Sequence, residues 1–284
     1  MKYLIFSLLI ILFGCSRSVQ HDKLLIAVSI PPQAWFVSQI AGENADVMIL
    51  VPPGQNPHNY EPTPRQIRSL SSASVWILSG SEFEISLRPK IEALFPDLLI
   101  VDGTLGVEFR TMEDHDHEDC DHDIFDRHTW LGRYPAIILA INVNTTLYHL
   151  DPDNIDFYME RTVSTVQDIQ DVFEDLKIIL TPLKGKSVFV YHPSFGYFLD
   201  EFGIIQEAVE TGGKEPTPRQ LNNLINRMRE TEAAAIFVQT QFPVTAARTI
   251  ANAVDAQVVE LDPLAENWLE NIRHIGESLQ RAIK

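Results

Sequence analysis

Residues 24–32 read Leu24-Leu25-Ile26-Ala27-Val28-Ser29-Ile30-Pro31-Pro32, an unbroken apolar run that reaches two prolines. A run of this kind predicts a strand that is buried on both faces, as the strands of parallel sheets are. The next segment, residues 34–41, has helical spacing of its apolar side chains and stops at Gly42. A buried strand followed directly by a helix is the repeating unit of α/β proteins, so this stretch favours that fold class.

Similar short apolar runs recur along the chain and predict further strands. They lie at residues 47–51, 75–78, 98–101, 187–191, 234–238 and 257–261. The segments between them have helical length, which predicts parallel sheets with helices on both faces. Residues 151–180 separate the two groups of strands, with Asp151 as a good N-cap, Pro152 at the first helical position and no later Pro or Gly. We expect a helix of about 40 Å here, which suits a rod that joins two lobes.

One hexapeptide occurs twice and supports two related lobes. Glu61-Pro62-Thr63-Pro64-Arg65-Gln66 returns unchanged as residues 215–220. Each copy predicts a helix start, with Thr as N-cap, Pro at N1 and Gln closing a capping box. Good helix starts resemble one another, but six identical residues in order favour one α/β unit used twice. We therefore predict two Rossmann-like lobes, residues 24–150 and 182–284, joined by a backbone helix at 151–181, with the ligand in the cleft between them.

The first residues predict export. Lys2 precedes an apolar stretch at residues 3–13, which would span about 16 Å as a helix and is too short to cross a bilayer. It ends in Leu12-Phe13-Gly14-Cys15, which resembles the bacterial lipobox; the alternative is an ordinary signal peptide with an incidental cysteine. We expect a signal peptide at 1–14, a lipid on Cys15, a tether at 15–23 and an extracytoplasmic protein anchored to the membrane. Cys120 would then have no partner, and no disulfide is expected.

Residues 113–128 are rich in both carboxylates and imidazoles. Eight acids lie between Glu113 and Asp126, interleaved with His115, His117, His122 and followed by His128. An acidic run alone is usually a solvated loop, but imidazole and carboxylate together are ligands for borderline divalent metals such as zinc. We expect a flexible metal-collecting loop at 113–125. The formal net charge of −17 argues against nucleic acid and against adhesion to anionic lipid.

Four candidate metal ligands follow predicted strands. His58 lies in a turn-rich loop after the second strand, His128 closes the acidic tract, and His192 and Asp262 each precede a proline at a strand end. Taken singly, such residues are more often turn residues or helix caps. Parallel α/β sheets, however, bind ligands beyond the carboxyl ends of their strands, and two of the four come from each half. Three imidazoles and one carboxylate predict a tetrahedral Zn²⁺ site that bridges the lobes.

The same residues carry a family resemblance. The matching motifs are Asn56-Pro57-His58-Asn59-Tyr60-Glu61-Pro62-Thr63-Pro64, Asp126-Arg127-His128-Thr129-Trp130-Leu131, His192-Pro193-Ser194-Phe195-Gly196-Tyr197-Phe198 and Leu261-Asp262-Pro263-Leu264. From about Lys23 to its end, the chain resembles the zinc- and manganese-binding solute-binding proteins of ABC importers, the ZnuA/TroA-like cluster A-I group. The resemblance maps the family's ligands onto His58, His128, His192 and Asp262, and its metal-rich loop onto residues 113–125.

The resemblance implies a function and also shows departures. It implies capture of extracytoplasmic Zn²⁺ and delivery to a membrane permease, with the chain as a monomer and not an enzyme. Manganese members usually carry Glu where this chain has His192, and imidazole favours zinc over the harder Mn²⁺. A proline is common at the place of Arg127, residues 132–135 replace the usual continuation, and Gln239 stands where Glu is frequent.

Other functions remain open from the sequence. They are manganese or iron binding within the same family, a metal-dependent surface adhesin, a siderophore binder of the same architecture and a zinc hydrolase. The hydrolase is disfavoured because the chain has no His-Glu-x-x-His motif and because Asp262 would fill the coordination position that a reactive water needs.

Overall fold

The structure is a computed structural model that describes residues 23–112, 125–210 and 217–283. The predicted signal peptide, the lipidation of Cys15, the loop ligands His115, His117 and His122, and Cys120 lie outside these residues.

The N-terminal lobe is built on a parallel four-stranded sheet. Its strands run in the order β2-β1-β3-β4, with β1 at Leu24–Val28, β2 at Ala45–Ile49, β3 at Val75–Leu78 and β4 at Leu99–Asp102. The connecting helices are α1 (Pro31–Ala41), α2 (Pro64–Leu70) and α3 (Glu82–Leu94). Residues 26–28 and 75–77 are fully buried, as the continuous apolar runs predict for central parallel strands.

The C-terminal lobe repeats this arrangement. Its sheet has the order β6-β5-β7-β8, with β5 at Ser187–Val190, β6 at Ile205–Ala208, β7 at Ala235–Gln239 and β8 at Gln257–Leu261. Helices α6 (Gly196–Glu201), α7 (Pro218–Glu230) and α8 (Val244–Val254) connect these strands. The two sheets therefore share one strand order, which confirms the prediction of two lobes with parallel sheets.

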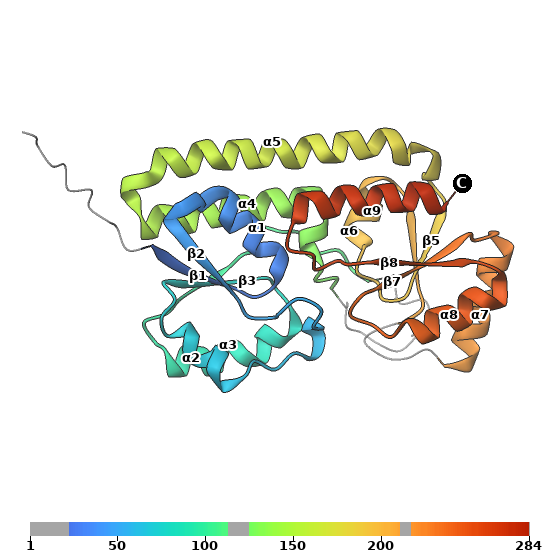
Figure 1. Ribbon diagram of the computed structural model, residues 1–284, viewed down its shortest axis with the longest axis horizontal. Coiled ribbons are helices and arrows are strands. Elements are labelled where there is room, and N and C mark those ends of the chain that lie inside the picture. The colour runs from blue at the N-terminus through green and yellow to red at the C-terminus, as the bar shows by residue number, and fades with distance from the viewer. Residues whose placement is uncertain (1–22, 113–124, 211–216, 284) are drawn as a thin grey trace, which may run out of the picture.

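Three helices form a layer along one side of both lobes. The long helix α5 (Ile155–Leu180) runs across the top of Figure 1, with α4 (Arg133–Leu150) and α9 (Trp268–Ala282) packed beneath it. Its inward face buries Tyr158, Ile169, Phe173 and Leu176, so α5 shares one core with both lobes. Within the described residues, none of the helices combines the length and the apolar character needed to cross a bilayer.

Several details differ from the expectations. Strand β2 begins and ends two residues earlier than predicted, and both β6 and α4 were missed. The start of the long helix was also wrong, because Pro152–Asn154 forms a separate turn of 3₁₀ helix before α5 begins at Ile155. The Asp151 carboxylate accepts hydrogen bonds from Asn154 and from the Tyr158 hydroxyl instead of capping the helix. Isolated turns and short alternating strands carry weak sequence signals, so tertiary packing decides them.

The predicted helix starts of the repeat are confirmed. Thr63 caps α2 and Thr217 caps α7, and each accepts a hydrogen bond from the backbone N–H of the Gln three residues later. The side-chain oxygen of each Gln in turn accepts a hydrogen bond from the threonine backbone N–H. The two capping boxes have the same geometry, with one at the start of a helix in each lobe.

Candidate metal site

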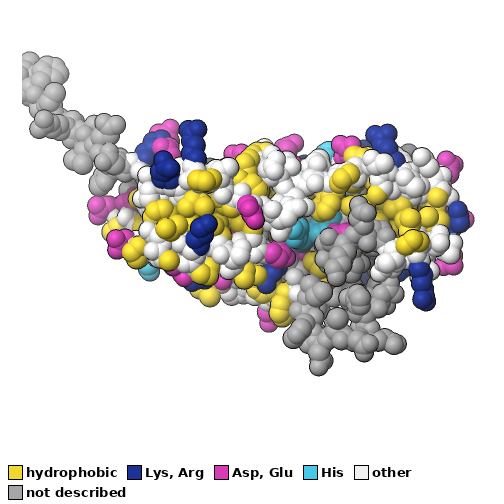
Figure 2. Space-filling model, turned by 90° about the horizontal axis from the view of Figure 1, so that it is seen from below, with side chains coloured by type: hydrophobic (Ala, Val, Ile, Leu, Met, Phe, Trp, Pro, Cys, Tyr) yellow, Lys and Arg dark blue, Asp and Glu magenta, His cyan; other side chains and the backbone are white. Residues whose placement is uncertain are grey.

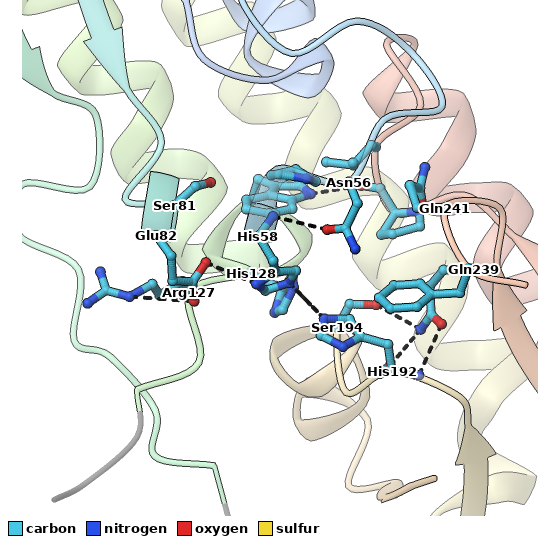
Figure 3. Close-up of a pocket in the computed structure, with 15 residues that line it drawn as sticks. Asn56, His58, Ser81, Glu82, Arg127, His128, His192, Ser194, Gln239 and Gln241 are labelled. Carbon is cyan, nitrogen blue, oxygen red and sulfur yellow. Dashed lines mark hydrogen bonds and ion pairs between the residues drawn. The ribbon is translucent and has the colours of Figure 1, made fainter. Parts of the chain in front are cut away.

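Three of the four predicted ligands meet between the lobes. His58 lies in a single 3₁₀ turn, Pro57–Asn59, where the Asn56 side chain accepts the His58 backbone N–H. His128 directly precedes the 3₁₀ turn Thr129–Leu131, and His192 follows β5. Their ligand atoms all lie within 4.8 Å of one another. Figure 3 shows the three rings pointing toward a common point, with His58 and His128 from one lobe and His192 from the other.

The nitrogens that converge are the Nε2 atoms. The Nε2 of His192 is 2.9 Å from that of His58 and 3.2 Å from that of His128. Two nitrogens that each bind one zinc ion at a tetrahedral angle stand about 3.3 Å apart, because Zn–N bonds are about 2.0–2.1 Å. The spacing of the imidazoles therefore already approaches that of a tetrahedral zinc site.

Each histidine also meets a carboxylate on its other nitrogen. Nδ1 of His58 is 3.1 Å from Glu82, Nδ1 of His128 is 2.8 Å from Asp126, and Nδ1 of His192 contacts Glu210. A carboxylate that accepts the Nδ1–H fixes the ring orientation and leaves the Nε2 lone pair for a metal. Carboxylate–histidine pairs of this kind are the usual outer partners of metal-binding histidines.

The carboxylates and burial give the histidines different proton affinities. Burial alone lowers the pKa of His58, but the hydrogen bond and charge of Glu82, with the charges of Glu210 and Asp126, outweigh it and raise that pKa above its ordinary value. Burial would raise the pKa of Glu82, but the hydrogen bond from His58 lowers it to about 2. The pKa of His192 falls to about 4, chiefly through burial. At neutral pH, His192 is thus unprotonated and ready to bind a cation.

His192 is held more firmly than His58. Its backbone N–H donates to the side chain of Gln239 (3.1 Å), whose amide donates back to the His192 carbonyl oxygen and to Ser194. Its ring stacks on Phe242, with the centroids 4.8 Å apart. The side chain of His192 is 6% exposed and that of His58 is 29% exposed, so the C-terminal lobe supplies the buried ligand.

Asp262, the fourth predicted ligand, makes hydrogen bonds with its own neighbours in the C-terminal lobe. Its Oδ1 accepts hydrogen bonds from the Gln241 side chain (2.7 Å) and from the Leu264 backbone N–H (2.9 Å). Among the described residues, the cluster of converging ligand atoms consists of the three histidines. Gln241, Pro263 and Leu264, which bond to Asp262 or follow it in the chain, line the cleft around the histidines.

The histidines lie at the bottom of a cleft that opens on one face. Asn56, Ser81, Arg127, Trp130 and Phe242 line it, some from each half of the chain. In Figure 2, histidine side chains gather at the middle of the face that lies away from α5.

The fold and the site define the class of protein. Two α/β lobes, a rigid helix that spans them and a histidine cluster in the cleft describe a metal-binding solute-binding protein. Residues 26–282 match the model of the ZnuA family, described as the zinc-uptake complex component A, periplasmic, and the chain belongs to this family. The resemblance found in the sequence is thereby confirmed. The proteins of this family are binding proteins and not enzymes.

Individual relatives include both zinc and manganese proteins. A solved structure, "Crystal structure of ZnuA", is 32% identical, with a TM-score of 0.86 over 92% of this chain and 99% of that one. "Zinc-binding lipoprotein AdcA" of Streptococcus pneumoniae (strain ATCC BAA-255 / R6) is 26% identical over 94% of this chain, which spans 55% of that protein. "Manganese ABC transporter substrate-binding lipoprotein PsaA" of Streptococcus pneumoniae is also 26% identical, over 84% of this chain and 78% of that protein. The comparisons place the chain among metal-uptake proteins without choosing between the two metals.

Sequence reasoning missed the three carboxylates that orient the histidines. Glu82 follows β3 and Glu210 follows β6, so both stand at strand ends, where polar residues gather around ligands. The strand-end position of both residues could therefore have indicated a role at the site. Asp126 lies two residues before His128, within a motif that had been recognised without a role for the carboxylate.

Proposed function

We propose that this protein captures Zn²⁺ outside the cytoplasm and delivers it to the permease of an ABC importer. The convergence of three Nε2 atoms, each on a ring oriented by a carboxylate, carries the proposal. Imidazole suits zinc well, whereas Mn²⁺ prefers oxygen ligands. The carboxylates also surround the site with negative charge, which attracts a divalent cation.

In this proposal, Asp262 supplies the fourth ligand. Its Oδ1 is held by Gln241 and the Leu264 N–H, which leaves Oδ2 for the metal. With this oxygen, the site would offer three nitrogens and one oxygen, a set that suits tetrahedral Zn²⁺.

The proposal that capture and delivery take place outside the cytoplasm rests on the sequence and on the names of the relatives. The lipobox-like Leu12-Phe13-Gly14-Cys15 agrees with the name lipoprotein carried by AdcA and PsaA. We propose that a lipid on Cys15 tethers the protein near its permease and that His115, His117 and His122 collect zinc with modest affinity. Deletion of residues 114–123 should then reduce the number of zinc ions bound and leave the tight site intact.

The decisive experiment measures metal identity and preference together. Protein purified without added metal is analysed by elemental analysis, and the metal-free protein is then titrated with Zn²⁺ and with Mn²⁺ against a chromophoric chelator. We expect zinc in the purified protein and an affinity for Zn²⁺ at least 100-fold above that for Mn²⁺, because the site offers three imidazoles. Manganese in the purified protein and equal affinities would overturn the zinc proposal and leave a metal-uptake protein of the same family.

A further inference from the structure

Arg110 connects the metal site to the opposite lobe. Its Nη1 lies 2.9 Å from Oδ2 of Asp126, and its Nε lies 2.9 Å from Oδ2 of Asp200 on α6. Asp126 is fully buried, and it is the carboxylate that contacts Nδ1 of His128. One guanidinium therefore joins an orienting group of the site to a helix of the C-terminal lobe.

The two carboxylate oxygens of Asp126 have different hydrogen-bond partners. Oδ1 accepts the backbone N–H of His128 (3.0 Å) and faces its Nδ1 (2.8 Å), while Oδ2 takes the bond from Arg110. A carboxylate bound through one oxygen only can turn about its Cβ–Cγ bond. Because Arg110 holds the second oxygen, this rotation is blocked, and the orientation of the His128 ring is fixed with it.

The backbone around this ion pair is also tied together. Asp126 N–H donates to the Arg110 carbonyl oxygen (2.9 Å), and Arg110 N–H donates to the Tyr197 hydroxyl (3.0 Å). The Tyr197 hydroxyl in turn donates to the Asp126 carbonyl oxygen (2.9 Å). Tyr197 belongs to α6, so the two segments that meet at Arg110 and Asp126 are clamped onto the helix that follows the His192 loop.

Gly196 makes this close approach possible. A Cβ atom at this position would lie 1.9 Å from Nη1 of Arg110 and 2.6 Å from Oδ2 of Asp126. The ion pair thus lies directly against the start of α6, four residues after His192. The carboxylate that orients His128 therefore packs against the helix that follows the His192 loop.

From this arrangement we infer that Arg110 is a positioning residue of the metal site, which locks the Asp126 carboxylate, and through it the His128 ring, against the lobe that carries His192. The inference rests on the proposed function only in that the three histidines bind a divalent ion. A residue that does not touch the metal thus determines how the rings of His128 and His192 are placed relative to each other.

The test compares two arginines that both bridge to the C-terminal lobe. Arg110→Met removes the contacts to Asp126 and Asp200. Arg133→Met is the matched control, because Arg133 bonds to Glu174 on α5 and Glu201 on α6 without contacting any of the three carboxylates that orient the histidines. We expect Arg110→Met to lower the affinity for Zn²⁺ and Co²⁺ by about tenfold, the low end of the range for outer partners of metal ligands. The visible spectrum of the Co²⁺ form should shift, and Arg133→Met should change neither readout.

A double-mutant cycle separates positioning from general destabilisation. If Arg110 acts through Asp126, the affinity lost by Arg110→Met together with Asp126→Asn should be clearly less than the product of the two single losses. Multiplicative losses, or a wild-type affinity and Co²⁺ spectrum in Arg110→Met, would overturn the inference. If Arg110→Met does not fold, Arg110→Lys replaces it; this variant keeps the charge but lacks the planar fork, and a several-fold loss is expected.

The wild-type titration distinguishes this inference from the proposed function. A wild-type protein that binds no divalent ion would overturn both. Binding of Zn²⁺ by the wild type with no effect of the Arg110 variants would overturn the positioning role alone. A preference of the wild type for Mn²⁺ would overturn the zinc proposal, while an Arg110 effect on Mn²⁺ binding would still support the positioning role.

Discussion

The two lobes have the same strand order but carry different chemistry at equivalent strand ends. The strand β1 leads into Ile30-Pro31, and its counterpart β5 leads into His192-Pro193. The edge strand β2 is followed by the loop that carries His58, and its counterpart β6 is followed by Glu210. The shared topology thus brings strand ends together at one cleft, and the residue placed at each end determines whether it binds a metal, orients a ligand or only packs.

Each lobe also has a buried glutamine that joins two neighbouring strand ends. In the N-terminal lobe, Gln33 accepts the N–H groups of Ser29 and Ile30 and donates to the carbonyl oxygen of Leu78 (3.0 Å). In the C-terminal lobe, Gln239 makes the equivalent link between β7 and the segment after β5. The first glutamine holds backbone alone, whereas the second holds the backbone of a ligand. Substitution of the two glutamines can therefore separate an effect on the stability of the fold from an effect on the metal site.

The largest effect should follow loss of the buried ligand. His192→Ala removes one of three imidazoles and leaves Glu210 without its partner, so we expect zinc affinity to fall by roughly three orders of magnitude. Competition titration against a chromophoric chelator measures this change. His274→Ala, at an exposed histidine of α9, is the matched control and should retain the wild-type affinity. Near-wild-type binding by His192→Ala would place the tight site elsewhere.

The two lobes should also differ in their response to pH. Binding requires an unprotonated Nε2. The raised pKa of His58 means that a proton competes at that ring at a higher pH than at an ordinary histidine, whereas the pKa of His192 is lowered to about 4. Below the pKa of His58, zinc affinity should fall about tenfold per pH unit.

Glu82→Gln provides the test of this pH dependence. It removes the main group that raises the pKa of His58, so the fall in affinity should begin at a lower pH than in the wild type. Titrations of both proteins between pH 8 and 5 would measure the shift. An identical pH profile in the variant would show that His58 does not set the pH dependence.

The paired glutamines should give a smaller effect that separates the lobes. Both Gln33→Met and Gln239→Met leave buried backbone groups without partners, and each should lower the free energy of unfolding by roughly 2–3 kcal/mol. Gln239→Met should also lower zinc affinity by about tenfold, because Gln239 holds His192, whereas Gln33→Met should leave it unchanged. Chemical denaturation of the metal-free proteins and competition titration measure the two quantities independently. Equal loss of affinity in both variants would mean that general stability, not local support, controls binding.

The residues that could be predicted were those with strong local signals. Continuous apolar runs located seven of the eight strands in the described part of the chain. The prolines and turn residues beside His58 and His192 marked both as strand-end ligands. Strand β6 was missed because its sequence, Ile205-Gln206-Glu207-Ala208, contains no continuous apolar run and its first residue is half exposed. Glu210 lies two residues beyond β6, so its strand-end position was missed as well.

The pairings of side chains could not be predicted, because they depend on how distant segments pack. Glu82 begins α3, whereas His58 lies in the turn after β2, and Arg110 is 90 residues from Asp200 in the chain. The same limit applies to Asp262, whose strand-end position indicated a ligand. Its hydrogen bonds with Gln241 and Leu264 could not be inferred from the sequence.

The smallest effect should come from the repeated capping boxes, whose surroundings differ between the lobes. In the N-terminal copy, Gln66 also donates to the carbonyl oxygen of Leu50 (2.7 Å) and exchanges hydrogen bonds with the Tyr60 hydroxyl, so it contacts both ends of the loop that carries His58. Gln220, in the C-terminal copy, bonds to Thr217 within its own helix start.

Gln66→Ala and Gln220→Ala therefore form a matched pair. Each should cost about 1 kcal/mol of stability through the lost cap, as measured by denaturation of the metal-free protein. Only Gln66→Ala should lower zinc affinity, and only by a few-fold, because the His58 loop loses an anchor and must be ordered when the metal binds. An equal effect of both variants on affinity would mean that the caps act on the fold alone. An effect of Gln66→Ala alone would show that one copy of a repeated helix start has become part of the support for the metal site.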